Sequence, residues 1–98
     1  MKLLNWYLIL EKDEVLKYVL AYGNVLNSNK FKNNTFIKTS HITKIKYNKE
    51  IDSIIIKTNS LSVYKLPIKH IDKNYLKDTK IALKFLLNKN INNIFNLN

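Results

Sequence analysis

Residues 41–66 read HITKIKYNKEIDSIIIKTNSLSVYKL, and their alternating pattern is the clearest indication of the fold in the sequence. Bulky β-branched and aromatic residues alternate with polar ones in three runs, which is the period of a β-strand. These runs cover 41–47, 51–58 and 61–66. Asn48-Lys49-Glu50 and Asn59-Ser60 separate them, and Asn reaches the left-handed backbone conformation that tight turns need. The stretch therefore predicts three consecutive antiparallel strands.

A further hairpin is predicted upstream of these strands. Trp6–Glu11 is a run of bulky residues, Lys12-Asp13-Glu14 is a charged turn, and Val15–Leu26 alternates with apolar residues on both faces. Gly23 is expected to form a bulge or a bend in the second strand. A polar loop follows, and residues 35–38 are expected to form a short extended piece.

The pattern changes after Pro67, where the strands are expected to end. Apolar residues recur at helical spacing from about Asp72, which predicts an amphipathic helix over 72–90 and leaves an Asn-rich tail at 91–98. Asp72 or Asn74 would cap this helix. We therefore predict an α+β fold in a single domain over 1–98. Its architecture would be a five-stranded, strongly curved antiparallel sheet or small barrel with one C-terminal helix.

The composition of the 98 residues restricts the class of protein. The chain has no Cys, so disulfides and thiolate metal sites are excluded, which suits the reducing cytoplasm. The apolar start, Met1–Leu10, is interrupted by Asn5 and followed by acids, unlike a signal peptide. Apolar runs are also shorter than the about 20 residues of a membrane helix. We expect a cytoplasmic protein with no membrane partner.

Charge is the strongest functional signal in the sequence. All 17 basic residues are Lys, against 7 acids, which gives a net charge of +10 and favours polyanionic partners. The sequence is also rich in Asn, Lys, Ile and Tyr, so AT-rich codons are a second explanation of part of this charge.

The basic residues are concentrated over 15–49, which contains seven Lys and no acid. The predicted binding site comprises Lys30, Lys32, Lys38, Lys44, Lys46 and Lys49, with Tyr47 and Tyr64 as exposed aromatic neighbours. A second, helical ridge comprises Lys73, Lys77, Lys80 and Lys84. This ridge is either a solvated outer face or a surface that tracks phosphates. The other strand aromatics, Trp6, Tyr7, Tyr18 and Tyr22, are expected to pack in the core or across strands.

Catalytic and metal chemistry are not expected. Ser40 and His41 are consecutive in a strand, so their side chains point to opposite faces and His41 is not placed to act as a base. Glu50 and Asp52 follow a turn, where solvated acids are ordinary. His41 and His70 lack the spacing of metal ligands. We predict no enzyme activity, no metal and no cofactor.

Three segments together carry a resemblance to a known group of proteins. They are Gly23-Asn24-Val25, FKNNTFIKTSHI at 31–42 and VYKL at 63–66. The segments resemble a loose family of short uncharacterised proteins from phages and other mobile elements, with the pattern G-x-V, F-x-D-G-T-x-I-x-T-S-x-I and Y-x-L. Asn33-Asn34 stands where that family has Asp-Gly, and a left-handed Asn would replace the Gly. The resemblance implies a small β-rich fold in a mobile-element setting, where anti-CRISPR inhibitors are one known class.

Two functions are consistent with these features. The first is a non-enzymatic binding protein that engages nucleic acid or a ribonucleoprotein, in the manner of an anti-CRISPR inhibitor of a host defence nuclease. The alternative is a protein interaction or homodimerisation module without a nucleic-acid role. In that case the contact would form through the C-terminal helix and the tail residues Ile91, Ile94, Phe95 and Leu97.

Overall fold

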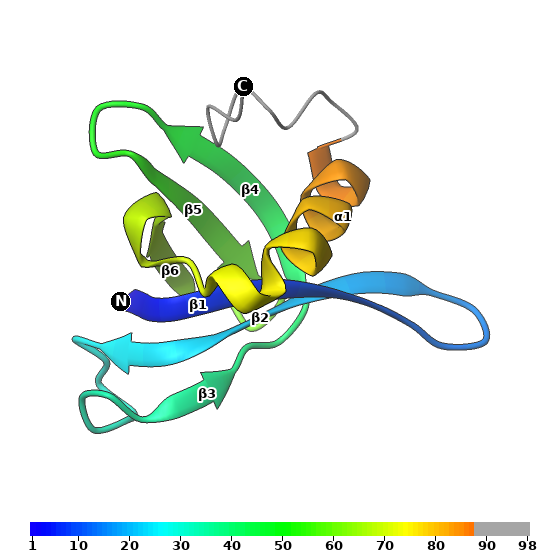
Figure 1. The fold of residues 1–98 in the computed structure, drawn as a ribbon. Coiled ribbons are helices and arrows are strands. Elements are labelled where there is room, and N and C mark those ends of the chain that lie inside the picture. Colours follow the sequence, from blue (N-terminus) through cyan, green and yellow to red (C-terminus); the bar gives the residue numbers. More distant parts are fainter. Residues whose placement is uncertain (88–98) are drawn as a thin grey trace.

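One mixed sheet of six strands and a C-terminal helix make up the fold, in a computed structural model that describes residues 1–87. The strands are β1 (Lys2–Lys12), β2 (Lys17–Leu26), β3 (Phe36–Lys38), β4 (Ile42–Asn48), β5 (Ser53–Thr58) and β6 (Val63–Pro67). Two short 3-10 turns, Ile68–His70 and Lys73–Tyr75, lead into helix α1 (Leu76–Leu87). The predicted α+β class and single described helix are confirmed, and Figure 1 shows their arrangement.

The predicted five-stranded antiparallel sheet was wrong in two respects. The extended piece at 35–38 pairs with β2 and becomes a sixth strand, β3. In addition, β1 begins at Lys2 rather than Trp6 and pairs in parallel with β6, with Lys2 beside Lys65. The strand order is β3-β2-β1-β6-β5-β4, so β3 and β4 remain as edges and the sheet does not close into a barrel.

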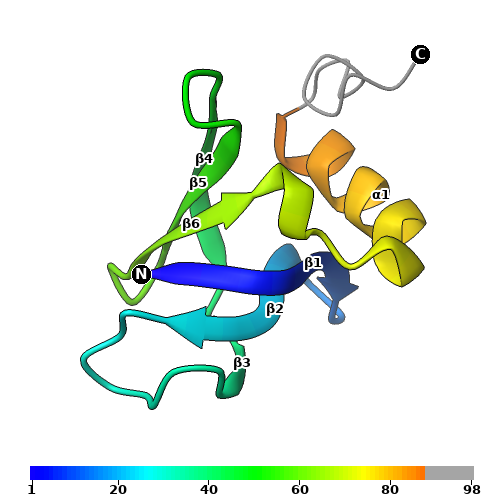
Figure 2. The same ribbon diagram turned by 60° about the vertical axis from the view of Figure 1, so that its left-hand side comes forward.

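Helix α1 fills the side of the curved sheet where β6 separates from β1. Both views place α1 beside β1 (Figures 1 and 2). The backbone N–H of Leu8 donates to the Thr79 Oγ1 at 3.1 Å, so the helix satisfies a strand donor that β6 leaves free. The regular helix begins at Leu76, after a turn that Asp72 caps by accepting from the Asn74 N–H. Residues 88–90 of the predicted helix and the tail at 91–98 lie outside the described residues.

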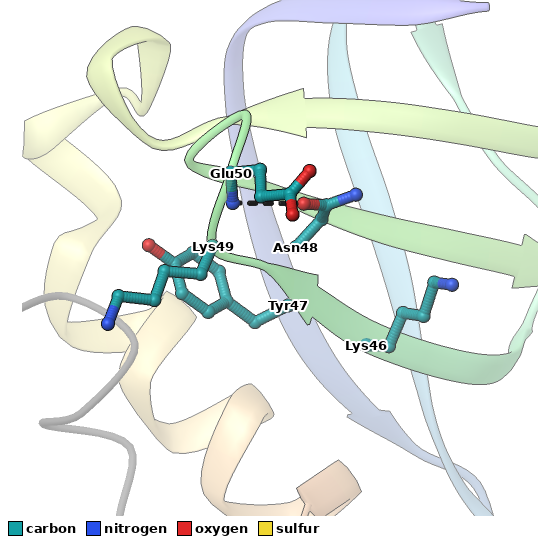
Figure 3. A pocket seen from close by; sticks show the side chains of 5 residues that line it. All are labelled: Lys46, Tyr47, Asn48, Lys49 and Glu50. Atoms are coloured by element: carbon teal, nitrogen blue, oxygen red, sulfur yellow. Dashed lines mark hydrogen bonds between the residues drawn. The ribbon is translucent and has the colours of Figure 1, made fainter.

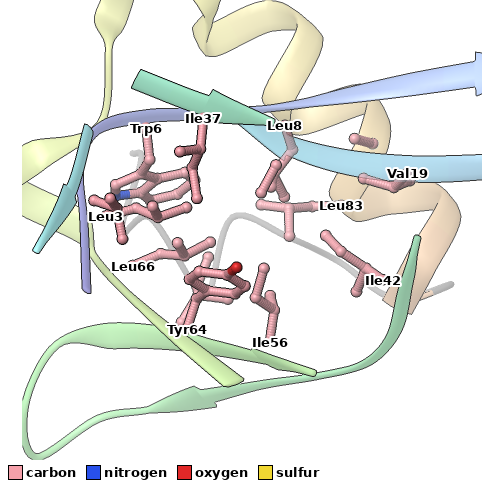
Figure 4. Packing of buried hydrophobic residues seen from close by; sticks show 14 residues of the cluster. Leu3, Trp6, Leu8, Val19, Ile37, Ile42, Ile56, Tyr64, Leu66 and Leu83 are labelled. Atoms are coloured by element: carbon pink, nitrogen blue, oxygen red, sulfur yellow. The ribbon is translucent and has the colours of Figure 1, made fainter. Parts of the chain in front are cut away.

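The core lies between the concave face of the sheet and α1. Figure 4 shows Trp6 and Tyr64 among the buried aliphatic side chains, with Leu83 contributed by the helix. The indole Nε1 of Trp6 donates to the Pro67 carbonyl at 2.6 Å, so this large side chain is also fixed in orientation. No helix within residues 1–87 has the length and apolar character that a membrane crossing requires.

A bulge in β1 decides which side chains reach the core. Asn5 has a left-handed φ of 50°, and the β1–β2 register shifts between Leu4 and Tyr7. Gly23 lies across from this bulge in β2, so the predicted irregularity occurs in the partner strand. A Cβ at position 23 would lie 3.0 Å from the Leu4 carbonyl oxygen and 3.2 Å from the Trp6 Cα, so the close approach requires glycine.

The turns use left-handed residues, but not always the predicted ones. Asn34 has a φ of 71°, so an asparagine takes the left-handed conformation in the β2–β3 loop, as expected for an Asn at a turn. In the β5–β6 turn the left-handed residue is Leu61, with a φ of 68°, rather than Asn59. Asp52, with a φ of 46°, takes this conformation within the β4–β5 turn.

Candidate binding surface

Five lysines lie on the convex face of the strands β1, β6, β5 and β4. The sheet register sets them side by side, because directly paired residues project to the same face. Lys44 pairs with Lys57, and Lys65 pairs with both Ile55 and Lys2, while Ile55 also pairs with Lys46. We call this set the lysine face: Lys2, Lys44, Lys46, Lys57 and Lys65.

The opposite face of the same strands is the core side, which fixes the orientation of the lysines. Ile54, Ile56, Tyr64 and Leu66 alternate with the lysine-face positions, and all four are buried. Lys44 and Lys46 are exposed, and the other three lysines are half-buried. Half-burial is typical of a lysine whose aliphatic stem lies along apolar surface while the ammonium group reaches water.

Apolar surface lies between these cations. Ile55 and Val63 occupy the same convex face, and Val63 pairs directly with Lys57. They help to line a shallow groove with a volume of about 330 Å³. The groove is lined by Lys44, Ile45, Lys46, Ile55, Ile56, Lys57 and Val63. The part of the lysine face formed by Lys44, Lys46 and Lys57 is therefore a groove with an apolar floor and a cationic border.

Two pairs of like charges stand out in this arrangement. Lys44 is the direct cross-strand partner of Lys57, and Lys2 is that of Lys65. Like charges directly opposite one another destabilise a sheet. A third such pair, Lys12 with Lys17, lies at the β1–β2 hairpin tip, where Glu11, Asp13 and Glu14 are close in sequence. Strands β4, β5 and β6 contain no acid, so the lysine face has no such neighbours within them.

The acids nearest in sequence to the lysine face, Glu50 and Asp52, border only one end of it. They belong to the β4–β5 turn, where Asp52 accepts a hydrogen bond from the Tyr47 hydroxyl at 2.5 Å. That hydrogen bond raises the pKa of Tyr47 above its usual value. A hollow of about 360 Å³ at this turn is lined by Lys46, Tyr47, Asn48, Lys49 and Glu50. Figure 3 shows the Lys46 side chain pointing away from the side on which Tyr47 and Lys49 lie.

The structure divides the predicted basic site into separate groups. Lys44 and Lys46 join the lysine face, while Lys49 lies in the turn on the Tyr47 side. Lys30 and Lys32 are in the β2–β3 loop, and Lys38 ends β3. Because β3 and β4 form opposite edges of the strand order, these three residues do not share a surface formed by paired strands with Lys44.

The expectation that Tyr64 is exposed was wrong. Tyr64 is 6% exposed and pairs with Ile56 on the core side of β6. Tyr47 is half-buried against the core. The predicted binding site did not include Lys57 and Lys65, although the alternation of their strands indicates that both project away from the core. Lys57 alternates with the buried Ile54 and Ile56, and so projects away from the core.

The second predicted ridge lies on and before α1. Lys73 is in the preceding 3-10 turn, and Lys77, Lys80 and Lys84 are on the helix. Lys80 is half-buried, while the others are exposed. Helix α1 also exposes Ile81 and Phe85, by 49% and 44%. The predicted homodimer contact through Ile91, Ile94, Phe95 and Leu97 lies outside the described residues.

Four aromatic side chains gather on the convex face of β1, β2 and β3. Tyr7 stacks on Tyr22 of the neighbouring strand and on Tyr75 of the 3-10 turn, and Phe36 adjoins them from β3. Trp6 packs in the core as predicted. Tyr7 and Tyr22 pack across strands, but on the outside of the sheet. Burial in this cluster raises the pKa of both Tyr7 and Tyr22.

The polar residues between β3 and β4 connect neighbouring segments through hydrogen bonds. The Thr39 Oγ1 accepts from the Ala21 N–H and donates to the Ser40 carbonyl, while the Ser40 hydroxyl contacts that of Ser60. The His41 ring stacks on Tyr18 with centroids 4.1 Å apart. Within the described part of the chain, no cluster of three or more His, Cys, Asp or Glu side chains could hold a metal ion.

Comparisons of this chain with protein-family models, with curated proteins and with solved structures found no match.

Proposed function

We propose that this chain is a non-enzymatic protein that binds the phosphate backbone of nucleic acid through the lysine face. The observation that carries this proposal is the direct pairing of Lys44 with Lys57 and of Lys2 with Lys65 on strands without acids nearby in the sheet. These repulsions are relieved when phosphates lie between the ammonium groups. The groove between the lysines supports the same conclusion, because its apolar floor accommodates sugars or bases.

The chemistry of the cations indicates what such a surface recognises. Lysine presents a single mobile point charge, whereas arginine presents a planar fork that matches base edges and phosphates in a bidentate manner. The chain has no Arg. Phosphate contacts position a ligand without reading its sequence. The proposed binding therefore depends on backbone charge and shape, with little preference among sequences.

Salt dependence tests the proposal. If all five lysines of the face contact phosphates, the log–log slope of affinity against salt should be about −3.5 on a single strand and about −4.5 on duplex. This slope is measured by titrating a fluorescent oligonucleotide of mixed sequence and following its anisotropy. The salt concentration is varied from about 50 to about 300 mM, a range over which counterion release changes the affinity strongly. A slope near zero would contradict the proposal.

The site is tested by reversing its charge. The variant Lys44→Glu/Lys46→Glu/Lys57→Glu should bind about 100-fold more weakly at 0.1 M salt, because three fewer counterions are released on binding. The matched control is Lys77→Glu/Lys80→Glu/Lys84→Glu, which makes the same change in net charge on α1. The control should retain most of the affinity. Equal losses in the two variants would show that binding follows net charge rather than the lysine face.

The resemblance over residues 23–66 supports a more specific form of this proposal. In a mobile-element setting, the bound nucleic acid would belong to a ribonucleoprotein, such as a host defence nuclease, that the protein inhibits in the cytoplasm. Affinity purification of the wild-type protein from its host should then recover a guide-RNA complex. The lysine-face variant serves as the control in that purification and should recover much less of it.

A further inference from the structure

The aromatic side chains on the convex face form an ordered row. Tyr7 lies in its centre, with ring centroids 5.0 Å from Tyr22 and 3.8 Å from Tyr75 and interplanar angles of 9° and 11°. Phe36 extends the row from edge strand β3, 6.3 Å from Tyr22. We call these four residues the aromatic row: Tyr7, Tyr22, Phe36 and Tyr75.

Packing within the protein explains only part of this row. Tyr7 and Tyr22 are half-buried and form a cross-strand pair, which is an ordinary source of sheet stability. The ends of the row are different, because Phe36 is 55% exposed and Tyr75 is 37% exposed. A contiguous aromatic surface that remains open to water at both ends is typical of a binding site.

Cations flank the Phe36 end of the row. Lys38 is the direct cross-strand partner of Tyr22, so its side chain projects to the same face. The Lys32 carbonyl accepts hydrogen bonds from both the N–H and the hydroxyl of Thr35, which holds Lys32 beside the start of β3. Two acids lie at other parts of the row. Asp72 is near Tyr7 but caps the 3-10 turn, and Glu11 is near Tyr22.

Tyr22 and Tyr75 cover the two faces of the Tyr7 ring, so only the ends of the row can take a further ring. We propose that these exposed ends, Phe36 above all, stack against unpaired bases of a single-stranded nucleic acid, while Lys32 and Lys38 contact its phosphates. Aromatic rings beside lysines match the alternating chemistry of such a strand, and stacking accepts every base because each has a π-face. Bases inside a duplex are already stacked on one another and cannot use the row. This inference rests on the proposed nucleic-acid function and specifies the form of its ligand.

A single exposed ring tests the inference without disturbing the core. Phe36→Ala should weaken binding of a fluorescent single-stranded oligonucleotide by about 5-fold or more, as expected for the loss of one stacked base. Binding of an abasic oligomer of the same length and charge should not change, because that oligomer has no base to stack. Phe36→Trp should restore the affinity. Phe85→Ala removes a similarly exposed ring from α1 and should have no effect.

The outcomes separate the two proposals. If Phe36→Ala behaves like Phe85→Ala, or if intact and abasic strands bind the wild type equally, the aromatic row is not a stacking site. The lysine-face variant should weaken both intact and abasic strands. If it weakens neither while Phe36→Ala weakens the intact strand, the lysine face fails and the row stands. If the wild type binds no oligonucleotide at all, both proposals are overturned.

Discussion

Replacing Trp6 by Ala should lower the free energy of unfolding by about 3–5 kcal/mol, the cost of deleting a large buried aromatic side chain. Trp6 is fully buried and follows the bulge that turns β1 toward the core. Its loss leaves a cavity between β1 and β6 and removes the hydrogen bond from the indole Nε1 to the Pro67 carbonyl. Urea denaturation followed by circular dichroism measures this change.

The variant Trp6→Phe separates the two contributions. It keeps most of the apolar volume but leaves the Pro67 carbonyl without its indole donor, which costs about 1–3 kcal/mol for a buried group. Trp6→Phe should therefore lie between the wild type and Trp6→Ala in stability. If Trp6→Ala lowered the free energy of unfolding by less than about 1 kcal/mol, the loss would be far under the usual range for such a deletion. The indole would then not be a central packing element of the core.

Replacing Leu83 by Ala should cost about 2–5 kcal/mol. Leu83 is fully buried and projects from α1 into the core, where Figure 4 shows it beside Leu8 and Ile42. If α1 fills the open side of the sheet, it is required for the stability of the whole domain. The change is measured as a shift of the urea midpoint, with the slope of the transition checked for a change in cooperativity.

The control for this variant lies on the same helix. Ile81→Ala deletes a side chain that is 49% exposed, so it should cost much less than Leu83→Ala. Both substitutions introduce Ala, which has the highest helix propensity, so propensity does not explain this difference. Equal destabilisation by the two substitutions would mean that α1 does not pack on the sheet through its Leu83 side.

Local pattern predicted the strands well, and long-range pairing accounts for the main errors. The three strands of 41–66 were expected from alternation and turns, and β4, β5 and β6 confirm them. Alternation within one strand does not reveal which distant strand lies beside it. The parallel contact of Lys2 with Lys65 joins parts of the chain that no local signal connects. This contact adds β1 to the middle of the sheet and leaves β3 at its edge.

The error at Tyr64 arose within one strand. In β6, Val63 shares one face with Lys65, and Tyr64 shares the other with Leu66, so alternation already favours an inward Tyr64. The pairing of Tyr64 with the buried Ile56 confirms this orientation. In β1, the bulge at Asn5 shifts the register, so that Trp6 faces the core and Tyr7 faces outward. Bulge positions of this kind are set by tertiary packing around Gly23.

The candidate site was predictable only where it lies within one strand. The spacing of Lys44 and Lys46 places both on one face, and the structure confirms this placement. Lys2, Lys57 and Lys65 join them through the sheet register, which depends on four strands. Lys30, Lys32 and Lys38 are close to Lys44 in sequence, but the strand order separates them.

Binding of nucleic acid at the lysine face is tested most directly by a backbone-amide NMR titration of the wild-type protein with a single-stranded oligonucleotide. We expect clear shifts, strongest at low salt, at Lys44, Lys46 and Lys57, in addition to those at the aromatic row, with little change at Lys77 and Lys84 on α1. Shifts confined to α1, or no shifts at any residue at low salt, would contradict binding at the lysine face.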